Sequence, residues 1–177
     1  MATSKAAAKK APAKKTPSAT KADAVALLKA DHAEVNACFK AYQKLVDQEA
    51  DAAERQPLAQ QICMLLTVHA TIEEEIFYPA AREVLDEDDL DMVDEADVEH
   101  ASAKDLIAQI QEMGPDDDHY DAKVKVLGEY IDHHVKEEQD ELFPAVVKAG
   151  MDNKAIGEEL SARKDELMAE MGMEAAG

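Results

Sequence analysis

The sequence has no tryptophan, and aromatic residues make up only 4% of its 177 positions. Glycine and proline, the commonest turn residues, occur six times each. Strands are built largely from aromatic and β-branched residues, whereas this chain is rich in the residues that favour helices. The composition therefore excludes a strand-rich fold and predicts an all-α protein. A chain of this length suits one domain and a tail.

Cysteine is scarce as well, with only Cys38 and Cys63 and no C-x-x-C pair. This excludes a disulfide-stapled fold and makes a thiolate metal site improbable, and it fits a reducing compartment. No stretch approaches the roughly 20 apolar residues that a membrane-spanning helix needs, and the N-terminus has no apolar leader segment. We therefore expect a cytoplasmic protein that does not contact a membrane.

Basic residues are too few to balance the acidic ones, and the formal net charge is −20. Six of the 19 Lys and Arg lie in residues 1–22, which contain no acid, so the remainder has 13 basic and 39 acidic residues, a net charge of −26. Such a body disfavours a nucleic-acid-binding core and attracts cations. Residues 1–22, rich in Lys, Ala and Pro, are predicted to be disordered. They either solubilise the protein or let it associate loosely with itself, or they make a weak contact with nucleic acid or another acidic partner.

Hydrophobic residues from Asp23 onward recur at steps of three and four, which is the helical period. The first helix should break near 48–56, and Pro57 suits the first position of the second helix. The third follows the acidic stretch 86–89. Gly114 and Pro115 should end the third helix, and Gly150 the fourth.

Four long helices with short links favour an up-down-up-down four-helix bundle over residues 23–150. The remaining residues, 151–177, contain a shorter and mostly charged helix at about 153–170, which we expect to be peripheral. The predicted organisation is thus a tail at 1–22, the bundle, and a C-terminal helix with its own short tail.

Each of the four helices carries one histidine at a position that is otherwise apolar. A single buried histidine is usually a hydrogen-bonded core residue, but four at comparable depth each need a partner, which a shared metal supplies. Two of them are followed four residues later by a glutamate, one turn along the same face. Imidazole and carboxylate without thiolate suit iron or another first-row metal. The candidate ligands are His32, His69, Glu73, His100, His134 and Glu138.

The second and fourth helices also repeat each other, because a glutamate lies four residues and a proline ten residues after both His69 and His134. His133 lacks this register and lies off the apolar face, so His134 is preferred. The first and third helices both carry an acid directly before the histidine, at Asp31 and Glu99. The chain therefore reads as a duplicated helical hairpin with a pseudo-twofold axis and one shared metal site.

With these motifs the sequence resembles the bacterial hemerythrin-like (HHE cation-binding) family over residues 23–150. The resemblance implies two iron ions with an oxo or hydroxo bridge, held by the four histidines as terminal ligands. Glu73 and Glu138 would bridge the irons. It implies a function in binding oxygen or a related small ligand for storage, delivery or sensing. A peroxide- or nitric-oxide-detoxifying enzyme and an iron storage or sensing protein are the alternatives, and the oligomeric state, monomer or dimer, stays open.

One position departs from the oxygen carriers of animals, in which a histidine lies four residues after the first histidine of the third helix. Here that position is Lys104. Either an extra coordination position is left open, or Lys104 lies at the rim and pairs with solvent or a carboxylate. Beside the site, Glu74 and Glu137 are interpreted either as a solvated acidic face or as residues that reach the metal or its ligands, and Tyr78 and Phe143 as packing residues.

Overall fold

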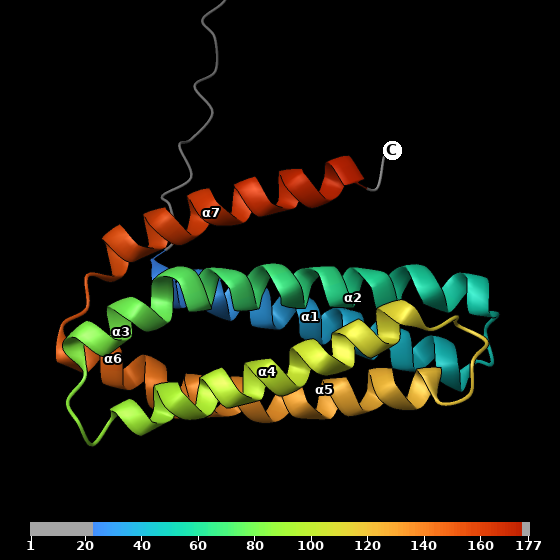
Figure 1. Ribbon diagram of the computed structural model, residues 1–177, viewed down its shortest axis with the longest axis horizontal. Helices are drawn as coiled ribbons and strands as arrows, with labels where there is room; N and C mark the ends of the chain where they lie inside the picture. The colour runs from blue at the N-terminus through green and yellow to red at the C-terminus, as the bar shows by residue number, and fades with distance from the viewer. Residues whose placement is uncertain (1–22, 175–177) are drawn as a thin grey trace, which may run out of the picture.

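The computed structural model describes residues 23–174, and within them every regular element is a helix (Figure 1). The disordered tail predicted at 1–22 lies outside the described residues. Four long helical segments, here called rods, lie side by side. Consecutive rods run in opposite directions, as the short links between them require (Figure 1). The predicted all-α four-helix bundle is thus confirmed.

The first two rods form one hairpin. The first is α1 (Ala24–Asp47), and Asp23 is its N-terminal cap. The Asp23 side chain accepts a hydrogen bond of 2.8 Å from the backbone N–H of Ala26. The second rod comprises α2 (Ala52–Ile72), a π-helical turn η1 (Glu73–Phe77) and α3 (Tyr78–Val84).

Pro57 was expected at the start of the second helix, but α2 begins at Ala52 and contains Pro57. The prediction was wrong because α2 starts five residues earlier, and its second turn tolerates the loss of the one backbone hydrogen bond that a proline cannot donate.

The last two rods form the second hairpin. The third rod is α4 (Leu90–Glu112). The fourth comprises α5 (Tyr120–Glu137), a second π-helical turn η2 (Glu138–Leu142) and α6 (Phe143–Ala149). It ends at Gly150 with φ 89°, the left-handed conformation that a glycine adopts without strain, so the predicted terminator is confirmed.

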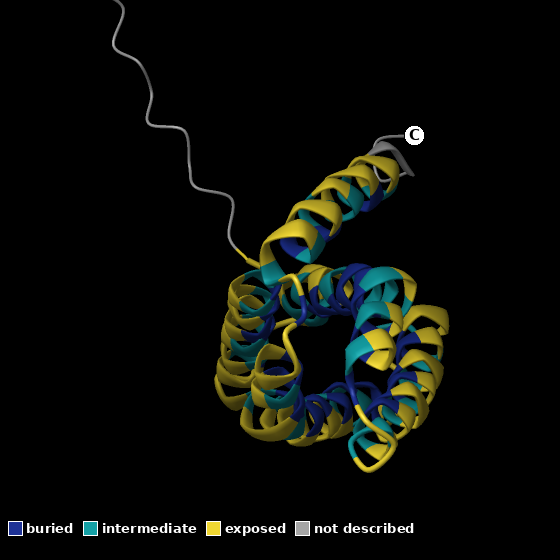
Figure 2. Ribbon diagram, turned by 90° about the vertical axis from the view of Figure 1, so that its left-hand side faces the viewer, coloured by how far each residue is buried: buried dark blue, intermediate teal, exposed yellow. Residues whose placement is uncertain are grey.

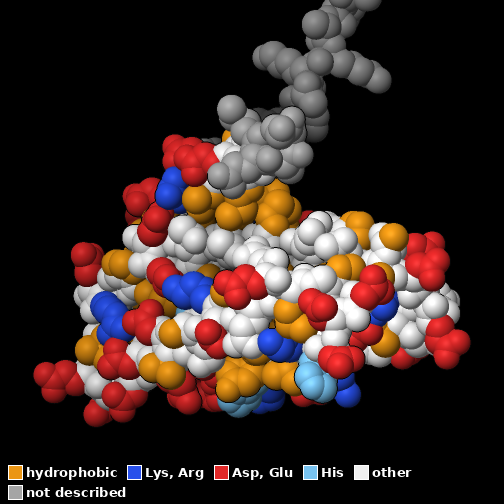
Figure 3. Space-filling model, turned by 45° about the vertical axis from the view of Figure 1, so that its right-hand side comes forward, with side chains coloured by type: hydrophobic (Ala, Val, Ile, Leu, Met, Phe, Trp, Pro, Cys, Tyr) orange, Lys and Arg blue, Asp and Glu red, His pale blue; other side chains and the backbone are white. Residues whose placement is uncertain are grey.

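The rods surround one interior, toward which their buried residues face (Figure 2). Two apolar clusters fill it. One contains Phe77 and Phe143, and the other contains Ile62 and Leu127. The predicted ligand residues lie near the middle of the helices, where one cluster gives way to the other. The bundle therefore holds a polar layer within an apolar core. Outside, acidic side chains are spread over much of the surface, as Figure 3 shows for one face.

The helix α7 (Asn153–Glu174) is longer than predicted and lies outside the ring of rods, against α1 and α2 (Figures 1 and 2). It is more than a peripheral element, because Leu160 and Leu167 are buried in the same cluster as Phe77. None of the helices in residues 23–174 combines the length and apolar character needed to cross a membrane.

Candidate metal centre

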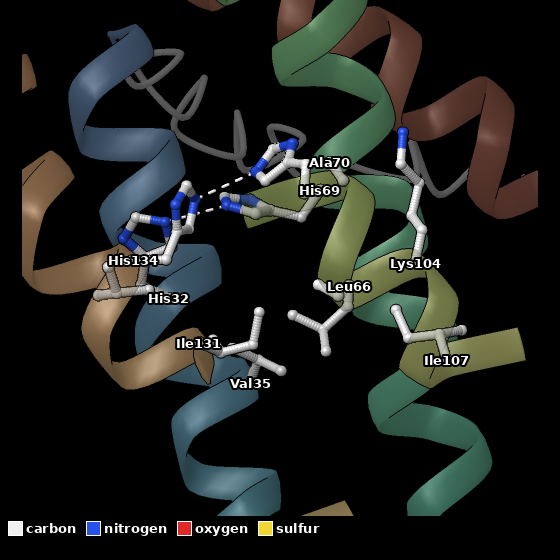
Figure 4. Close-up of a pocket in the computed structure, with 12 residues that line it drawn as sticks. His32, Val35, Leu66, His69, Ala70, Lys104, Ile107, Ile131 and His134 are labelled. Carbon is white, nitrogen blue, oxygen red and sulfur yellow. Dashed lines mark hydrogen bonds between the residues drawn. The ribbon is translucent and has the colours of Figure 1, made fainter. Parts of the chain in front are cut away.

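The six residues predicted as metal ligands come together in the middle of the bundle, and each is at most 7% exposed. Their imidazoles meet in pairs through the Nε2 atoms, which are 2.9 Å apart in one hairpin and 3.1 Å apart in the other (Figure 4). The first pair is His32 and His69, and the second is His100 and His134. The two hairpins thus present equivalent pairs of ring nitrogens to one interior space.

Two buried glutamates join the hairpins. Oε2 of Glu73 lies 3.2 Å from Nε2 of His69 and 3.4 Å from Nε2 of His100. Oε2 of Glu138 lies 3.2 Å from Nε2 of His32 and 3.5 Å from Nε2 of His134. Each carboxylate therefore approaches one histidine of its own hairpin and one of the other.

The donor atoms fall into two groups, each compact enough for one metal ion, with all ligand atoms within 4.8 Å of one another. Glu73 belongs to both groups, which is the arrangement of a carboxylate shared between two ions. The first group is His32, His69, Glu73 and Glu138, and the second is Glu73, His100 and His134.

Both glutamates begin a π-helical turn, at η1 and η2. Such single turns contain an extra residue, which shifts the direction of the side chains that they carry. Pro79 and Pro144 follow the two turns, where their missing N–H groups favour the interruption of the α-helical ladder. The π turns thus lie at the ligand positions themselves, just before the prolines.

The outward ring nitrogens have polar neighbours. Nδ1 of His134 lies 2.8 Å from Glu99, Nδ1 of His100 lies 3.0 Å from Glu74, and Nδ1 of His69 lies 3.6 Å from Asp31. A carboxylate at Nδ1 holds the proton there and leaves the Nε2 lone pair free to face inward. In the fourth case the amide of Gln139 lies 3.0 Å from Nδ1 of His32.

Sequence reasoning missed this outer layer. Asp31 and Glu99 each precede a histidine, yet each contacts the histidine of the neighbouring helix in its hairpin. Of the two interpretations of Glu74, the structure has the contact with a ligand residue, because its carboxylate contacts His100 and lies 2.7 and 2.8 Å from Nζ of Lys104. Of the two expectations for Lys104, the structure has the pairing with a carboxylate, and Figure 4 shows its side chain across the cavity from His32 and His134.

Tyr78 is a second residue that sequence reasoning missed. Its hydroxyl donates a hydrogen bond of 3.0 Å to Oε1 of Glu138 and lies 3.2 Å from Nε2 of His100. Burial, followed by the charges of Glu73 and Glu138, raises its pKa well above the ordinary value, so the phenol keeps its proton. The available signal was the repeat itself, in which Tyr78 aligns with Phe143 and only one of the two carries a hydroxyl.

The two buried glutamates have carboxylate oxygens without hydrogen-bond partners. Both oxygens of Glu73 and Oε2 of Glu138 have no hydrogen-bond partner. Burial and the charge of Glu138 raise the pKa of Glu73 well above its usual range. Burial also acts to raise the pKa of Glu138, but its contact with His32 and the charges of the histidines lower it to about 2. A cation between the two carboxylates would stabilise both, so the residues fit a metal.

Two of the four imidazoles have a lowered pKa; in His134 burial acts in the same direction, but the hydrogen bond with Glu99 raises the pKa above its ordinary value. Burial, followed by the charge of His134, lowers the pKa of His100 to about 4, and burial lowers that of His69. A neutral imidazole is the form that binds a metal. Nitrogen and oxygen donors without sulfur suit a first-row metal ion.

A small cavity of about 20 Å³ adjoins the four histidines, enough for one water-sized molecule (Figure 4). Its wall away from the histidines is apolar, and Lys104 is its one charged lining residue. The apolar lining residues include Val35, Leu66, Ile107 and Ile131.

Comparison with known proteins agrees with this geometry. The sequence model of the family described as "Hemerythrin HHE cation binding domain" matches residues 23–146. A solved structure of a hemerythrin HHE cation binding domain-containing protein from Mycobacterium kansasii superposes with a TM-score of 0.68 at 20% identity. The match covers 84% of this chain and 88% of that one, and it supports the fold.

A curated relative from Nostoc sp. (strain PCC 7120 / SAG 25.82 / UTEX 2576) is named "DNA nickase". It is 29% identical over 153 residues, which cover 85% of this chain. The aligned region spans only 42% of that relative's length.

Proposed function

We propose a function from the premise that this chain belongs to the hemerythrin HHE cation-binding domain family, whose model matches residues 23–146. The chain is a non-haem di-iron protein that binds oxygen or a related small ligand for storage, delivery or sensing. The observation that supports this most directly is Glu73, a fully buried carboxylate without a hydrogen-bond partner that belongs to both groups of donor atoms.

Six residues would hold the irons. His32 and His69 serve one position, His100 and His134 the other, and the two glutamates join them. When bound, two irons supply two electrons to one small ligand, so no lone radical is left. The protein contributes fixed imidazoles, since each Nδ1 has a polar neighbour that orients the ring.

The cavity beside the histidines supports a small and uncharged ligand. Its volume of about 20 Å³ admits a molecule of the size of water or a diatomic gas. Apolar side chains such as Leu66 and Ile107 line it, and they disfavour bulk water.

A peroxide- or nitric-oxide-detoxifying enzyme is the second candidate, and Tyr78 is the observation that favours it. A buried phenol that keeps its proton, placed between His100 and Glu138, can donate a hydrogen bond to a ligand in the site and stabilise the negative charge that develops when the ligand is reduced.

The curated relative named "DNA nickase" motivates a further proposal on partners. Residues 1–22 contain six lysines and no acid, and such a segment fits a polyanion. The full chain should bind duplex DNA weakly, with an affinity that falls steeply as salt is raised. Retention of the same affinity after removal of residues 1–22 would contradict this proposal.

Iron stoichiometry measured together with the optical spectrum tests the main proposal. The purified protein should contain two irons per chain, show near-ultraviolet absorption of a bridged iron pair, and take up oxygen reversibly when reduced. A colourless, zinc-only or mononuclear protein would refute it. Gas evolution from hydrogen peroxide that depends on Tyr78, in a variant that keeps its iron, would favour the enzyme.

A further inference from the structure

The two hairpins are related by the repeat, but their outer faces differ. α7 packs against α1 and α2, and it covers the first hairpin. The residues of that hairpin beside the site are accordingly apolar. Val68 and Ile72 are at most 1% exposed, and Leu27 and Ile76 are partly buried in the same cluster as Leu160 of α7.

The matching face of the second hairpin is acidic. Its residues follow from the two offsets that align the histidines, 68 positions from His32 to His100 and 65 from His69 to His134. At the positions equivalent to Leu27, Val68, Ile72 and Ile76, the second hairpin has Glu95, His133, Glu137 and Glu141. The residue equivalent to Asp31 is Glu99.

Three of these residues are close enough to bind one cation. The ligand atoms of Glu99, His133 and Glu137 all lie within 4.8 Å of one another. Nε2 of His133 is 3.1 Å from Oε1 of Glu137 and 3.7 Å from Oε1 of Glu99. The His133 side chain is 63% exposed, so a hydrated ion can reach it. In Figure 3, histidine side chains lie at the surface beside hydrophobic ones at the lower edge of the molecule, the side on which α4 and α5 lie in Figure 1.

A polar cavity connects this face to the buried ligands. It has a volume of about 50 Å³ and is lined by four glutamates at its outer side and by His134 and Glu138 at its inner side. Glu138 is 2% exposed, and its Oε2 has no hydrogen-bond partner. An unpartnered buried carboxylate thus faces a cavity that begins at carboxylates on the surface. The four glutamates are Glu95, Glu99, Glu137 and Glu141.

Glu99 belongs to the outer group and contacts a histidine of the inner one. Its Oε1 faces His133, while its Oε2 accepts the hydrogen bond of 2.8 Å from Nδ1 of His134. An ion held at the outer group is therefore one side chain away from the buried donors.

We propose that Glu99, His133 and Glu137 form a transit site for a divalent cation, and that the acidic cavity is the route by which metal reaches the buried ligands. The inference rests on the proposed function of those ligands in holding metal. Nitrogen and oxygen donors suit a first-row divalent ion, and exposure keeps the outer site weak enough to release it. The apolar cavity on the other side, with Lys104 in its wall, is unsuited to a cation. Metal and small ligand thus have separate routes.

Cobalt uptake tests the route, because Co²⁺ changes its visible absorption when imidazole binds it. Metal-free protein is mixed with Co²⁺, and the rate is followed in wild type and in the double variant His133→Ala with Glu137→Gln. Loss of negative charge that concentrates cations at this face should slow cobalt uptake by about tenfold or more. Asp140→Asn is the matched control, since Asp140 is 61% exposed, pairs with Lys136 and does not line the cavity.

The final cobalt content shows whether the outer residues only pass the metal inward or hold it permanently. Wild type and double variant should both end with two ions per chain. Equal rates in the two proteins would overturn the proposal, and so would a lower final content in the double variant, because the outer residues would then hold the resident metal. Wild type that ends with fewer than two ions would instead contradict the proposed function, whatever the relative rates.

Discussion

The hydroxyl of Tyr78 donates a hydrogen bond of 3.0 Å to Oε1 of Glu138, whereas Phe143, at the equivalent position of the other hairpin, stacks on His32. The ring planes of Phe143 and His32 are 6° apart, with centroids 5.9 Å apart. The two histidine pairs therefore have unlike surroundings. One has a phenol beside it and the other a purely apolar ring.

Tyr78→Phe tests the value of that hydroxyl. The substitution keeps the ring that packs in the core but leaves Oε1 of the buried Glu138 without its donor. We expect metal-free protein to lose about 1–3 kcal/mol of unfolding free energy. Urea denaturation measures this, and Tyr130→Phe is the control, because Tyr130 is 45% exposed. Equal losses in the two variants would show that the hydrogen bond contributes nothing.

Leu160→Ala tests whether α7 is part of the folded core. Leu160 is fully buried within the cluster that contains Phe77 and Phe143, so its truncation leaves a cavity between α7 and the bundle. The expected loss of unfolding free energy is about 2–5 kcal/mol. Val147→Ala, at a position that is 53% exposed, should change it by no more than about 0.5 kcal/mol. A neutral Leu160→Ala would mean that α7 does not dock in solution.

The inward histidines were accessible to sequence reasoning because periodicity decides which face of a helix a residue occupies. The Glu four residues after His69 or His134 follows from the same rule. The partners of the outward ring nitrogens could not be predicted from the sequence, because Asp31 contacts a residue on the neighbouring helix. Rotation of α1 against α2 sets that contact, and nothing local in the sequence encodes it. The π turns were hidden for a similar reason, since their sequences also suit an ordinary helix.

Deletion of residues 1–22 should leave the iron content unchanged. The first described helix begins at Ala24 and has its own N-terminal cap at Asp23, so the bundle does not need the preceding segment to start α1. The measurement is iron per chain by elemental analysis, on full-length and shortened protein prepared together. Loss of iron on deletion would show that the lysine-rich segment takes part in loading or holding metal.

Cys63 should be inert in the native protein. It is 1% exposed, and burial raises its thiol pKa from 9.0 to about 11. At pH 8 only about one molecule in a thousand then carries the reactive thiolate. With Cys38→Ser leaving Cys63 as the one thiol, alkylation should proceed only through unfolding. The raised pKa also means that the unfolded state loses this proton first, so stability should fall as pH rises from 9 toward 11. Rapid alkylation at pH 8 would contradict the buried placement.

His134→Ala and His133→Ala compare adjacent residues of one helix that face different surroundings. His134 is buried, with Nε2 3.1 Å from that of His100 and 3.5 Å from Oε2 of Glu138. His133 is 63% exposed and contacts Glu99 and Glu137. Removal of His134 deletes a donor at the shared centre, so iron per chain should fall below two. Removal of His133 should leave two irons at equilibrium and alter only the rate at which they arrive.

Circular dichroism should establish that both variants keep their helix, so that a low iron content reports a missing ligand. Equal iron losses in the two variants would place the centre elsewhere than at the buried histidines. A loss confined to His133→Ala would reverse the register that the repeat assigns to the fourth helix. The expected pattern follows from the 65-residue offset, which pairs His134 with His69 and His133 with the buried Val68.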